Sequence, residues 1–180
     1  ELAHIIRGVV NHGMYERYHH DVVGVNSRLD SVQAAVLDIK LKHLNDFSAS
    51  RQNAARHYTE ALSKSEHIET PQTKTYKKCD NSQGICDTCD CHVFHQYTIK
   101  IKNGKRDELA EHFKKNNIPH GIYYPIPLHS QKAYRDERYD EKEFSVTNQL
   151  VDEVISLPMH TELDKEQIDY ITSEIIKVVG

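Results

Sequence analysis

The sequence predicts an α+β fold, in which a small, mostly antiparallel sheet is packed by helices and joined to a long linking helix. Residues 93–101 alternate between apolar and polar side chains, which indicates a strand that is covered on one face only. The strands of a doubly wound parallel sheet are apolar throughout, so this alternation favours an antiparallel sheet. Residues 28–62 contain no glycine or proline and carry an apolar stripe at helical spacing, which predicts an unusually long helix.

The N-terminal elements are predicted from their spacing. Residues 1–13 have leucine, isoleucine and valine at helical spacing and end in a glycine, which predicts the last turns of a helix. Residues 15–26 are polar and rich in tyrosine and histidine, and predict an ordered loop. Ser27 and Asp30 have capping-box spacing, so Ser27 is expected to cap the linking helix. The stripe over residues 28–62 fits one long helix or two in near-continuation.

The later elements alternate between short strands and short helices. They are an extended piece at 67–71, a polar hairpin or insertion at 73–90, a turn at 103–104, helices at 106–116 and 145–154, strands at 118–124 and 155–157, and a rigid loop at 125–129. Asp164 and Gln167 have the spacing of a cap and its N3 partner, and they predict the start of a last helix.

Charge and hydropathy exclude two classes of partner. The 180 residues carry a formal net charge of -4, and acidic and basic side chains are interspersed. No run of like charge reaches the length of a nucleic-acid or membrane arm, and no stretch approaches the roughly 18 apolar residues of a membrane span. The N-terminus, Glu1-Leu2-Ala3-His4, lacks the features of a signal peptide and resembles the interior of a helix. We therefore expect a cytoplasmic protein whose chain begins before Glu1.

Polar side chains gather ahead of the linking helix. Residues 11–13 are Asn-His-Gly, residues 18–20 are Tyr-His-His, and residues 24–30 are Gly-Val-Asn-Ser-Arg-Leu-Asp. Free N–H groups at a helix N-terminus, together with asparagine and arginine side chains, suit such a segment to bind an anion. The alternative is a turn followed by an ordinary helix cap.

A second candidate loop carries two tyrosines and a histidine. Prolines at alternate positions hold residues 125–129 extended and rigid. Tyr123, Tyr124 and His129 are therefore placed to contact a ligand. The alternative puts the tyrosines in the core and His129 on the surface.

The cysteines form a candidate metal site. All four, Cys79, Cys86, Cys89 and Cys91, lie in one polar segment. Thiolates suit a tetrahedral structural zinc ion. The spacing is one CxxC that overlaps a CxC, rather than two separated CxxC pairs, so a redox pair, a disulfide or free thiols in a loop stay open as alternatives.

Several motifs together resemble the DegT/DnrJ/EryC1/StrS sugar aminotransferase family. The N-terminal ones are Asn11-His12-Gly13, Tyr18-x-His20, Gly24-x-Asn26 and Arg28-Leu29-Asp30-x-x-Gln33-Ala34-Ala35. The later ones are Lys40-Leu41-x-x-Leu44, His92-Val93-Phe94-His95-Gln96-Tyr97, Tyr124-Pro125-x-Pro127-Leu128-His129-x-Gln131-x-x-Tyr134 and Leu157-Pro158-Met159-His160-x-x-Leu163. They occur in order over nearly the whole chain, which is far more specific than any one of them.

The resemblance implies the C-terminal part of a fold-type I pyridoxal-phosphate enzyme that acts as a homodimer. Members of the family transfer an amino group, usually from glutamate, to a keto-sugar attached to a nucleotide. The Schiff-base lysine belongs to the family's N-terminal half, so no catalytic residue is expected here, and the chain alone is expected to be inactive. Residues 1–27 would end the large cofactor-binding domain, residues 28–62 would link, and residues 63–180 would form the small domain with a cysteine-rich insertion at 79–91.

The resemblance also implies roles for single residues. Asn26 and Arg28 would bind the cofactor, and Tyr18, His20, Tyr124 and His129 would bind the nucleotide-sugar substrate. Two alternatives stay open. One is a catalytically inactive family member that acts as a sensor or regulator, and the other is a zinc-binding interaction module built around the cysteines.

Overall fold

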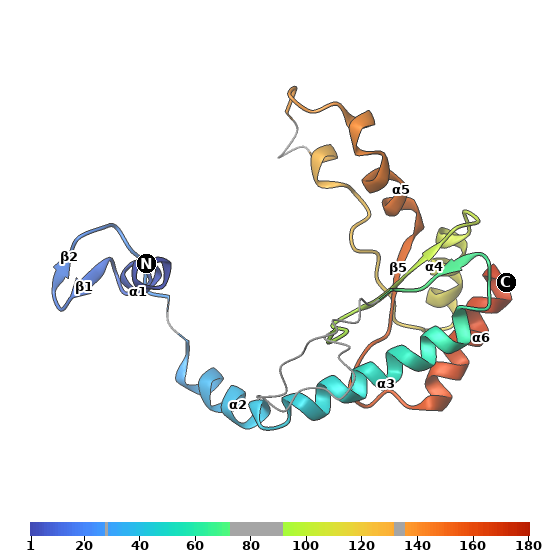
Figure 1. Cartoon of the computed structure of the whole chain (residues 1–180), viewed down its shortest axis with the longest axis horizontal. Helices are drawn as coiled ribbons and strands as arrows, with labels where there is room; N and C mark the ends of the chain where they lie inside the picture. The colour runs from blue at the N-terminus through green and yellow to red at the C-terminus, as the bar shows by residue number, and fades with distance from the viewer. Residues whose placement is uncertain (28, 73–91, 132–135) are drawn as a thin grey trace. The chain divides into compact units, whose positions relative to one another are not determined.

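The chain divides into two compact units, residues 1–44 and residues 45–180. The computed structural model describes residues 1–27, 29–72, 92–131 and 136–180 (Figure 1). Helices accompany two small antiparallel sheets, one of two strands and one of three. The predicted α+β class is therefore confirmed.

The first unit combines two helices with a short hairpin. Its elements are α1 (Leu2–Val10), β1 (Met14–Glu16), β2 (His19–His20) and α2 (Ser31–Leu41). Met14 pairs with His20 across the hairpin, within the segment that was predicted to be a loop. An isolated antiparallel bridge joins Asn11 to Asn26, so the chain returns past the end of α1 before α2 begins.

Two glycines allow this return because the backbones approach too closely for a side chain. A Cβ added at Gly24 would lie 2.1 Å from the Gly13 nitrogen and 2.5 Å from the Val9 carbonyl oxygen. A Cβ at Gly13 would lie 1.7 Å from the Val22 carbonyl oxygen, and Gly13 also has φ +77°. Backbone atoms cannot move aside as a flexible side chain can, so both positions require glycine.

The cap of α2 differs from the prediction. Asp30 is the N-cap, and its carboxylate accepts hydrogen bonds from the backbone N–H groups of Val32 (2.7 Å) and Gln33 (3.3 Å). The Ser27 N–H donates instead to the Val10 carbonyl oxygen at 3.0 Å. The prediction that Ser27 caps this helix is therefore wrong, because its backbone is held beside the end of α1 and the helix starts later.

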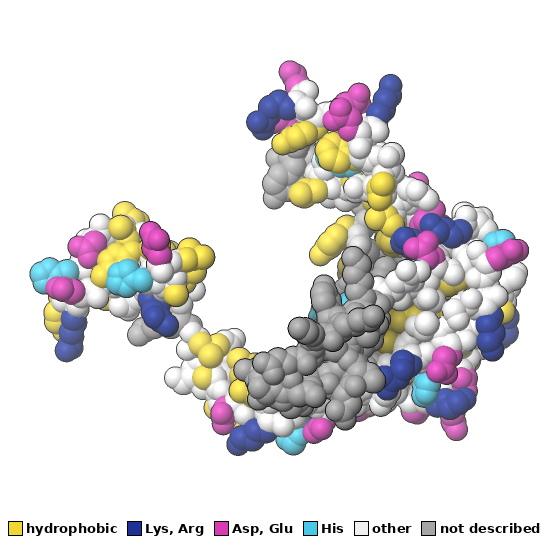
Figure 2. All heavy atoms as spheres, in the orientation of Figure 1, with side chains coloured by type: hydrophobic (Ala, Val, Ile, Leu, Met, Phe, Trp, Pro, Cys, Tyr) yellow, Lys and Arg dark blue, Asp and Glu magenta, His cyan; other side chains and the backbone are white. Residues whose placement is uncertain are grey.

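α2 exposes several apolar side chains. No residue of this helix is buried. Its exposed apolar residues are Val32, Val36, Leu37, Ile39 and Leu41, and hydrophobic side chains are visible on the surface of this part of the chain (Figure 2). Within the described residues, this helix is therefore stabilised by its cap and its backbone hydrogen bonds rather than by burial.

The second unit contains the main sheet and most of the core. Its helices are α3 (Leu44–Leu62), which begins at the unit boundary, α4 (Arg106–Lys115), α5 (Ser145–Glu153) and α6 (Lys165–Val179), with 3-10 turns η2 (Leu128–Ser130) and η4 (Glu141–Phe144). The strands β3 (Ile68–Glu69), β4 (Tyr97–Ile101) and β5 (Val154–Leu157) pair in the order β3-β4-β5, all antiparallel. Lys42 and His43 separate α2 from α3, so the linking segment consists of two helices.

One face of this sheet supplies the core. Tyr97, Ile99 and Ile101 alternate with half-buried residues along β4, as the sequence predicted for residues 97–101. They pack in one cluster with apolar residues of α3, α4, β5 and α6, among them Tyr58, Leu62, Leu109, Phe113, Ile155, Ile168 and Ile175. The alternation predicted from residue 93 does not hold before Tyr97, because Phe94 has φ +45° and turns its side chain into the core.

The predicted strand at 118–124 is reduced to a single bridge. Gly121 pairs with Ser156, and each backbone N–H donates to the other residue's carbonyl oxygen, at 3.1 and 2.7 Å. Beyond this bridge the backbone leaves the edge of β5. The apolar residues that suggested a strand therefore mark a brief contact with the sheet.

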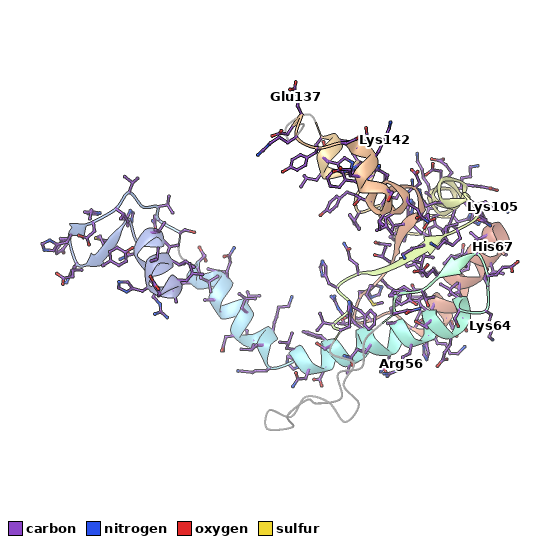
Figure 3. All side chains as sticks on the ribbon, turned by 45° about the horizontal axis from the view of Figure 1, so that its top comes forward. Arg56, Lys64, His67, Lys105, Glu137 and Lys142 are labelled. Carbon is purple, nitrogen blue, oxygen red and sulfur yellow. The ribbon has the colours of Figure 1, made fainter. Side chains whose placement is uncertain are left out.

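Basic and amide side chains close the end of α6. The Lys105 ammonium group donates to the Val178 carbonyl oxygen at 2.8 Å, and the Asn103 amide donates to the Val179 carbonyl oxygen at 3.0 Å. Lys105 is labelled in Figure 3. These carbonyls have no partner within the helix, and a cation also suits the negative end of the helix dipole. At its other end α6 has the capping box predicted from Asp164 and Gln167. No helix in the described parts of the chain is long and apolar enough to cross a membrane.

Candidate functional site

The first unit carries three of the predicted site residues. Tyr18 lies in the hairpin turn with φ +69° and is 76% exposed, and the Arg17 guanidinium lies 4.9 Å from the centre of its ring. His20 lies on β2, and its Nδ1 donates to the His12 carbonyl oxygen at 2.8 Å. A carbonyl can only accept, so this contact leaves Nε2 as the lone-pair nitrogen of the neutral ring.

Asn26 follows at the end of the return segment. Its backbone pairs with Asn11, and the residue is exposed. The structure thus ties Tyr18, His20 and Asn26 each to a different neighbour. Arg28, the second predicted cofactor ligand, lies outside the described residues.

The hydrogen bonds within the first unit show which of its groups suit a phosphate. The Asp30 carboxylate accepts from the backbone amides of Val32 and Gln33, and it also places a negative charge at the start of α2. The helix cap that was the alternative is thus present, and anion binding ahead of this helix stays a prediction. Asn26 is exposed, and the nitrogen of its neutral side-chain amide is of the donor type that suits a phosphate oxygen.

The second candidate loop, in the other unit, exposes its tyrosines. Tyr123 is 50% exposed and Tyr124 is 75% exposed, and their rings meet edge to face with centroids 5.9 Å apart. The Tyr123 ring lies over Gly121, where an added Cβ would come within 2.5 Å of it. The alternative that buried both tyrosines in the core is wrong.

His129 is half-buried, and residues of η4 and α5 hold its ring. Its ring stacks on Phe144 with centroids 4.3 Å apart and planes 15° apart, and Tyr139 meets Phe144 edge to face. Its Nε2 lies 3.1 Å from the Asn148 side-chain oxygen. Sequence reasoning missed Asn148 and Phe144, because nothing in a linear pattern shows that α5 returns to this loop.

A small open pocket of about 290 Å³ lies where the bridge at Gly121 meets the sheet, and no sequence pattern predicted it. Its polar lining includes His95, Gln96, His120 and Tyr123. His120 Nδ1 donates to the Ile118 carbonyl oxygen at 3.0 Å, so its Nε2 is the lone-pair nitrogen of the neutral ring. Among the described residues that line this pocket there is no carboxylate or ammonium group, which suits it to neutral polar groups.

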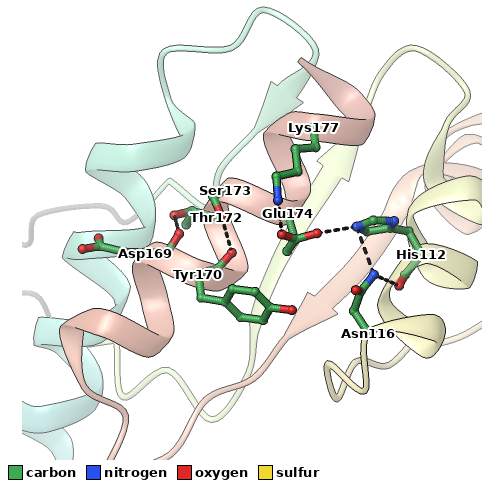
Figure 4. A network of polar contacts seen from close by, with 8 residues as sticks. All are labelled: His112, Asn116, Asp169, Tyr170, Thr172, Ser173, Glu174 and Lys177. Carbon is green, nitrogen blue, oxygen red and sulfur yellow. Dashed lines mark hydrogen bonds and ion pairs between the residues drawn. The ribbon is translucent and has the colours of Figure 1, made fainter.

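A connected cluster of charged and polar side chains lies between α4 and α6 (Figure 4). The nearly buried Glu174 carboxylate accepts from His112 Nε2 at 2.6 Å and from the Lys177 ammonium group. Asn116 donates to the His112 carbonyl oxygen at 2.8 Å. The hydrogen bonds from Lys177 and His112 lower the pKa of Glu174 below its ordinary value. This cluster joins α4 to α6.

The predicted zinc ligands, Cys79, Cys86, Cys89 and Cys91, all lie outside the described residues. Within the described ranges, no group of three or more His, Cys, Asp or Glu side chains is placed to hold a metal ion.

Relatives of known name match the chain almost from end to end. A Geobacillus stearothermophilus protein named "Pleiotropic regulatory protein" is 38% identical over 97% of this chain and 44% of its own length. An Acidithiobacillus ferrooxidans protein named as a UDP-N-acetyl-3-dehydro-alpha-D-glucosamine 3-aminotransferase is 36% identical over 97% of this chain and 42% of its own length. The chain thus spans less than half the length of the curated relatives it matches.

Solved structures also match the chain over nearly its whole length. The structure of S. venezuelae DesV in complex with a ketimine intermediate superposes with a TM-score of 0.82 at 31% identity, covering 98% of this chain and 43% of that one. A DegT DnrJ EryC1 StrS aminotransferase from Brucella abortus superposes with a TM-score of 0.82 at 33% identity, covering 99% of this chain and 44% of that one. The profile of the DegT/DnrJ/EryC1/StrS aminotransferase family matches residues 1–176. The chain therefore belongs to the DegT/DnrJ/EryC1/StrS aminotransferase family.

Proposed function

We propose that this chain is the C-terminal part of a cytoplasmic, homodimeric, pyridoxal-phosphate-dependent aminotransferase, which transfers an amino group from glutamate to a nucleotide-linked keto-sugar. The observation that carries the proposal is the family match over residues 1–176. Several matching relatives are named as transaminases of UDP- or dTDP-linked sugars, among them the Acidithiobacillus protein and a 31% identical one from Aneurinibacillus thermoaerophilus.

The proposed parts follow the chain. Residues 1–27 end the large domain, residues 28–62 link, and residues 63–180 form the small domain. Pyridoxal phosphate supplies an aldehyde and an electron-withdrawing ring when it is bound, and the lysine that holds it would come from outside this chain. This chain supplies groups that bind and orient.

Asn26 is the described residue best suited to the cofactor phosphate. Its amide is exposed at the end of a segment fixed by the bridge to Asn11. Arg28 would add a positive charge beside it. Tyr18 and His20 would contact the substrate from the hairpin, and Tyr124 and His129 from the loop of the second unit.

The test uses the complete protein that contains this chain. With pyridoxal phosphate, glutamate and a UDP- or dTDP-linked keto-sugar, we expect 2-oxoglutarate to form in amounts that match the aminated sugar. Asn26→Ala is expected to weaken cofactor binding about tenfold, the value of one hydrogen bond to a charged group. Gln149→Ala, an exposed amide on α5, is the matched control and is expected to bind like the wild type.

The alternative of a catalytically inactive regulator predicts the opposite result for 2-oxoglutarate formation. It predicts cofactor or sugar binding without any transfer of nitrogen, and a 2-oxoglutarate assay that stays at background would favour it. The named nucleotide-sugar transaminases support the enzyme. The zinc module gains no support from the described residues.

A further inference from the structure

The orientation of the Asn148 amide is fixed by two contacts of opposite kind. Its Nδ2 donates to the backbone carbonyl oxygen of Glu141 at 3.0 Å, and its Oδ1 lies 3.1 Å from His129 Nε2. A carbonyl can only accept, so the amide nitrogen must face Glu141. A flipped amide would set two acceptor oxygens against each other, and the oxygen must therefore face His129.

The same logic fixes the proton on His129. The Asn148 oxygen can only accept, so His129 Nε2 must carry the hydrogen that lies between them. In the neutral ring this leaves Nδ1 with its lone pair. No residue in the described parts of the chain donates a hydrogen bond to Nδ1, although His129 is half-buried.

Further contacts hold the ring plane. Phe144 stacks on the imidazole at 4.3 Å, and Tyr139 meets Phe144 edge to face. The neighbouring Ser130 hydroxyl donates to the Glu141 carboxylate at 3.1 Å, which ties the turn η2 to the turn η4. The ring thus has a fixed place, a fixed plane and a fixed hydrogen.

We propose that Asn148 is a positioning residue, which holds His129 in its Nε2–H form and so presents Nδ1 as a hydrogen-bond acceptor to a hydroxyl group of the substrate sugar. This inference rests on the proposed function for the identity of the ligand. The fixed hydrogen itself does not depend on that function. An Nδ1 lone pair selects donors, so it takes a sugar hydroxyl and repels a phosphate oxygen.

The first experiment reads the hydrogen directly. The complete protein is labelled with 15N only in its histidines, and solid-state NMR separates N–H nitrogens from lone-pair nitrogens at a pH where the ring is neutral. The signal of His129 is identified among those of the other histidines by its loss in His129→Gln. We expect Nε2–H to dominate in the wild type and its ratio to Nδ1–H to fall about fivefold to tenfold in Asn148→Ala.

Two variants separate positioning from folding. Phe144→Leu removes the stacking but keeps the amide, so its tautomer ratio is expected to stay on the wild-type side. Gln149→Ala lies next to Asn148 on α5, bonds to Glu153 instead, and is expected to change nothing. A wild-type ratio in a folded Asn148→Ala protein, or an Nδ1–H majority in the wild type, would overturn the proposal.

The second experiment concerns the substrate. In the transamination assay, Asn148→Ala is expected to raise KM for the nucleotide sugar about fivefold while KM for glutamate stays within twofold. An equal rise in both would overturn the substrate half of the inference. If the wild type shows no transamination at all, the proposed function fails, and with it the hydroxyl ligand, while the NMR result still decides the role of Asn148.

Discussion

Arg106 offers a test of how the sheet and α5 are held together. It is 7% exposed, and its Nη1 donates to the carbonyl oxygens of Val151 at 2.7 Å and Val154 at 3.1 Å. These carbonyls belong to the last turn of α5 and the residue after it, where no helical partner exists. The Arg106 guanidinium, in the first turn of α4, therefore caps the C-terminal end of α5.

The destabilisation expected on replacing Arg106 follows from these two hydrogen bonds. Hydrogen bonds to a charged group contribute about 1.5–3 kcal/mol each, and the second bond of a shared nitrogen contributes less. The contact with Asp107 adds little, because that carboxylate is 84% exposed. Arg106→Met keeps the stem, removes the donors and leaves two carbonyls without a partner, so we expect a loss of about 2–4 kcal/mol in the free energy of unfolding.

The assay is urea unfolding followed by near-UV circular dichroism. The chain has no tryptophan, and the buried rings of Tyr58 and Tyr97 report on the second unit. With a slope of about 2 kcal/mol per molar urea, the midpoint is expected to fall by about 1–2 M. Arg106→Lys, which keeps the cation but loses the planar fork, should recover part of this loss. A midpoint of Arg106→Met within 0.2 M of the wild type would refute the reasoning.

Three further predictions concern other contacts. Gly24→Ala forces a Cβ against backbone atoms and is expected to expose the first unit to limited proteolysis, whereas Gly104→Ala meets nothing within 4 Å and should cost only about 1 kcal/mol for its φ of +74°. Tyr97→Phe removes the 2.7 Å contact with the Thr59 hydroxyl, so urea unfolding should show a loss of about 1 kcal/mol. The lowered pKa of Glu174 contributes stability that is present above the carboxyl's ordinary value of 4.5 and is lost as pH falls through the folded pKa, so the stability gap between wild type and Glu174→Gln should shrink in acid, as measured by unfolding midpoints from pH 7 to pH 3.

Local rules predicted the elements whose partners are close in sequence. The capping box of Asp164 and Gln167 needs only one turn of helix, and both of its hydrogen bonds are present. The alternation over residues 97–101 reflects a face that any covering layer would bury. Both patterns depend only on residues that are close in the sequence, so the sequence alone was sufficient to predict these two elements.

The failures have distant causes. Ser27 and Asp30 match a capping box, but the Ser27 N–H is taken by Val10, which arrives from α1. Arg106 begins a helix whose positive end a cation does not suit, and the sequence gives no reason for it. The reason lies in the carbonyls of α5, some 45 residues later. Asn148 was missed for the same cause, since its partner is fixed by how α5 packs.

The hydrogen-bond chemistry of three histidines bears on which groups each of them can bind. His20 and His120 each donate from Nδ1 to a backbone carbonyl, and His129 donates from Nε2 to an amide oxygen. Each neutral ring therefore has an acceptor as its remaining nitrogen. Acceptors match sugar hydroxyls and do not match phosphate oxygens. The phosphate of a cofactor would then depend on donors such as the Asn26 amide. The loss of that amide is therefore expected to weaken cofactor binding, whereas the loss of Asn148 is expected to weaken binding of the sugar.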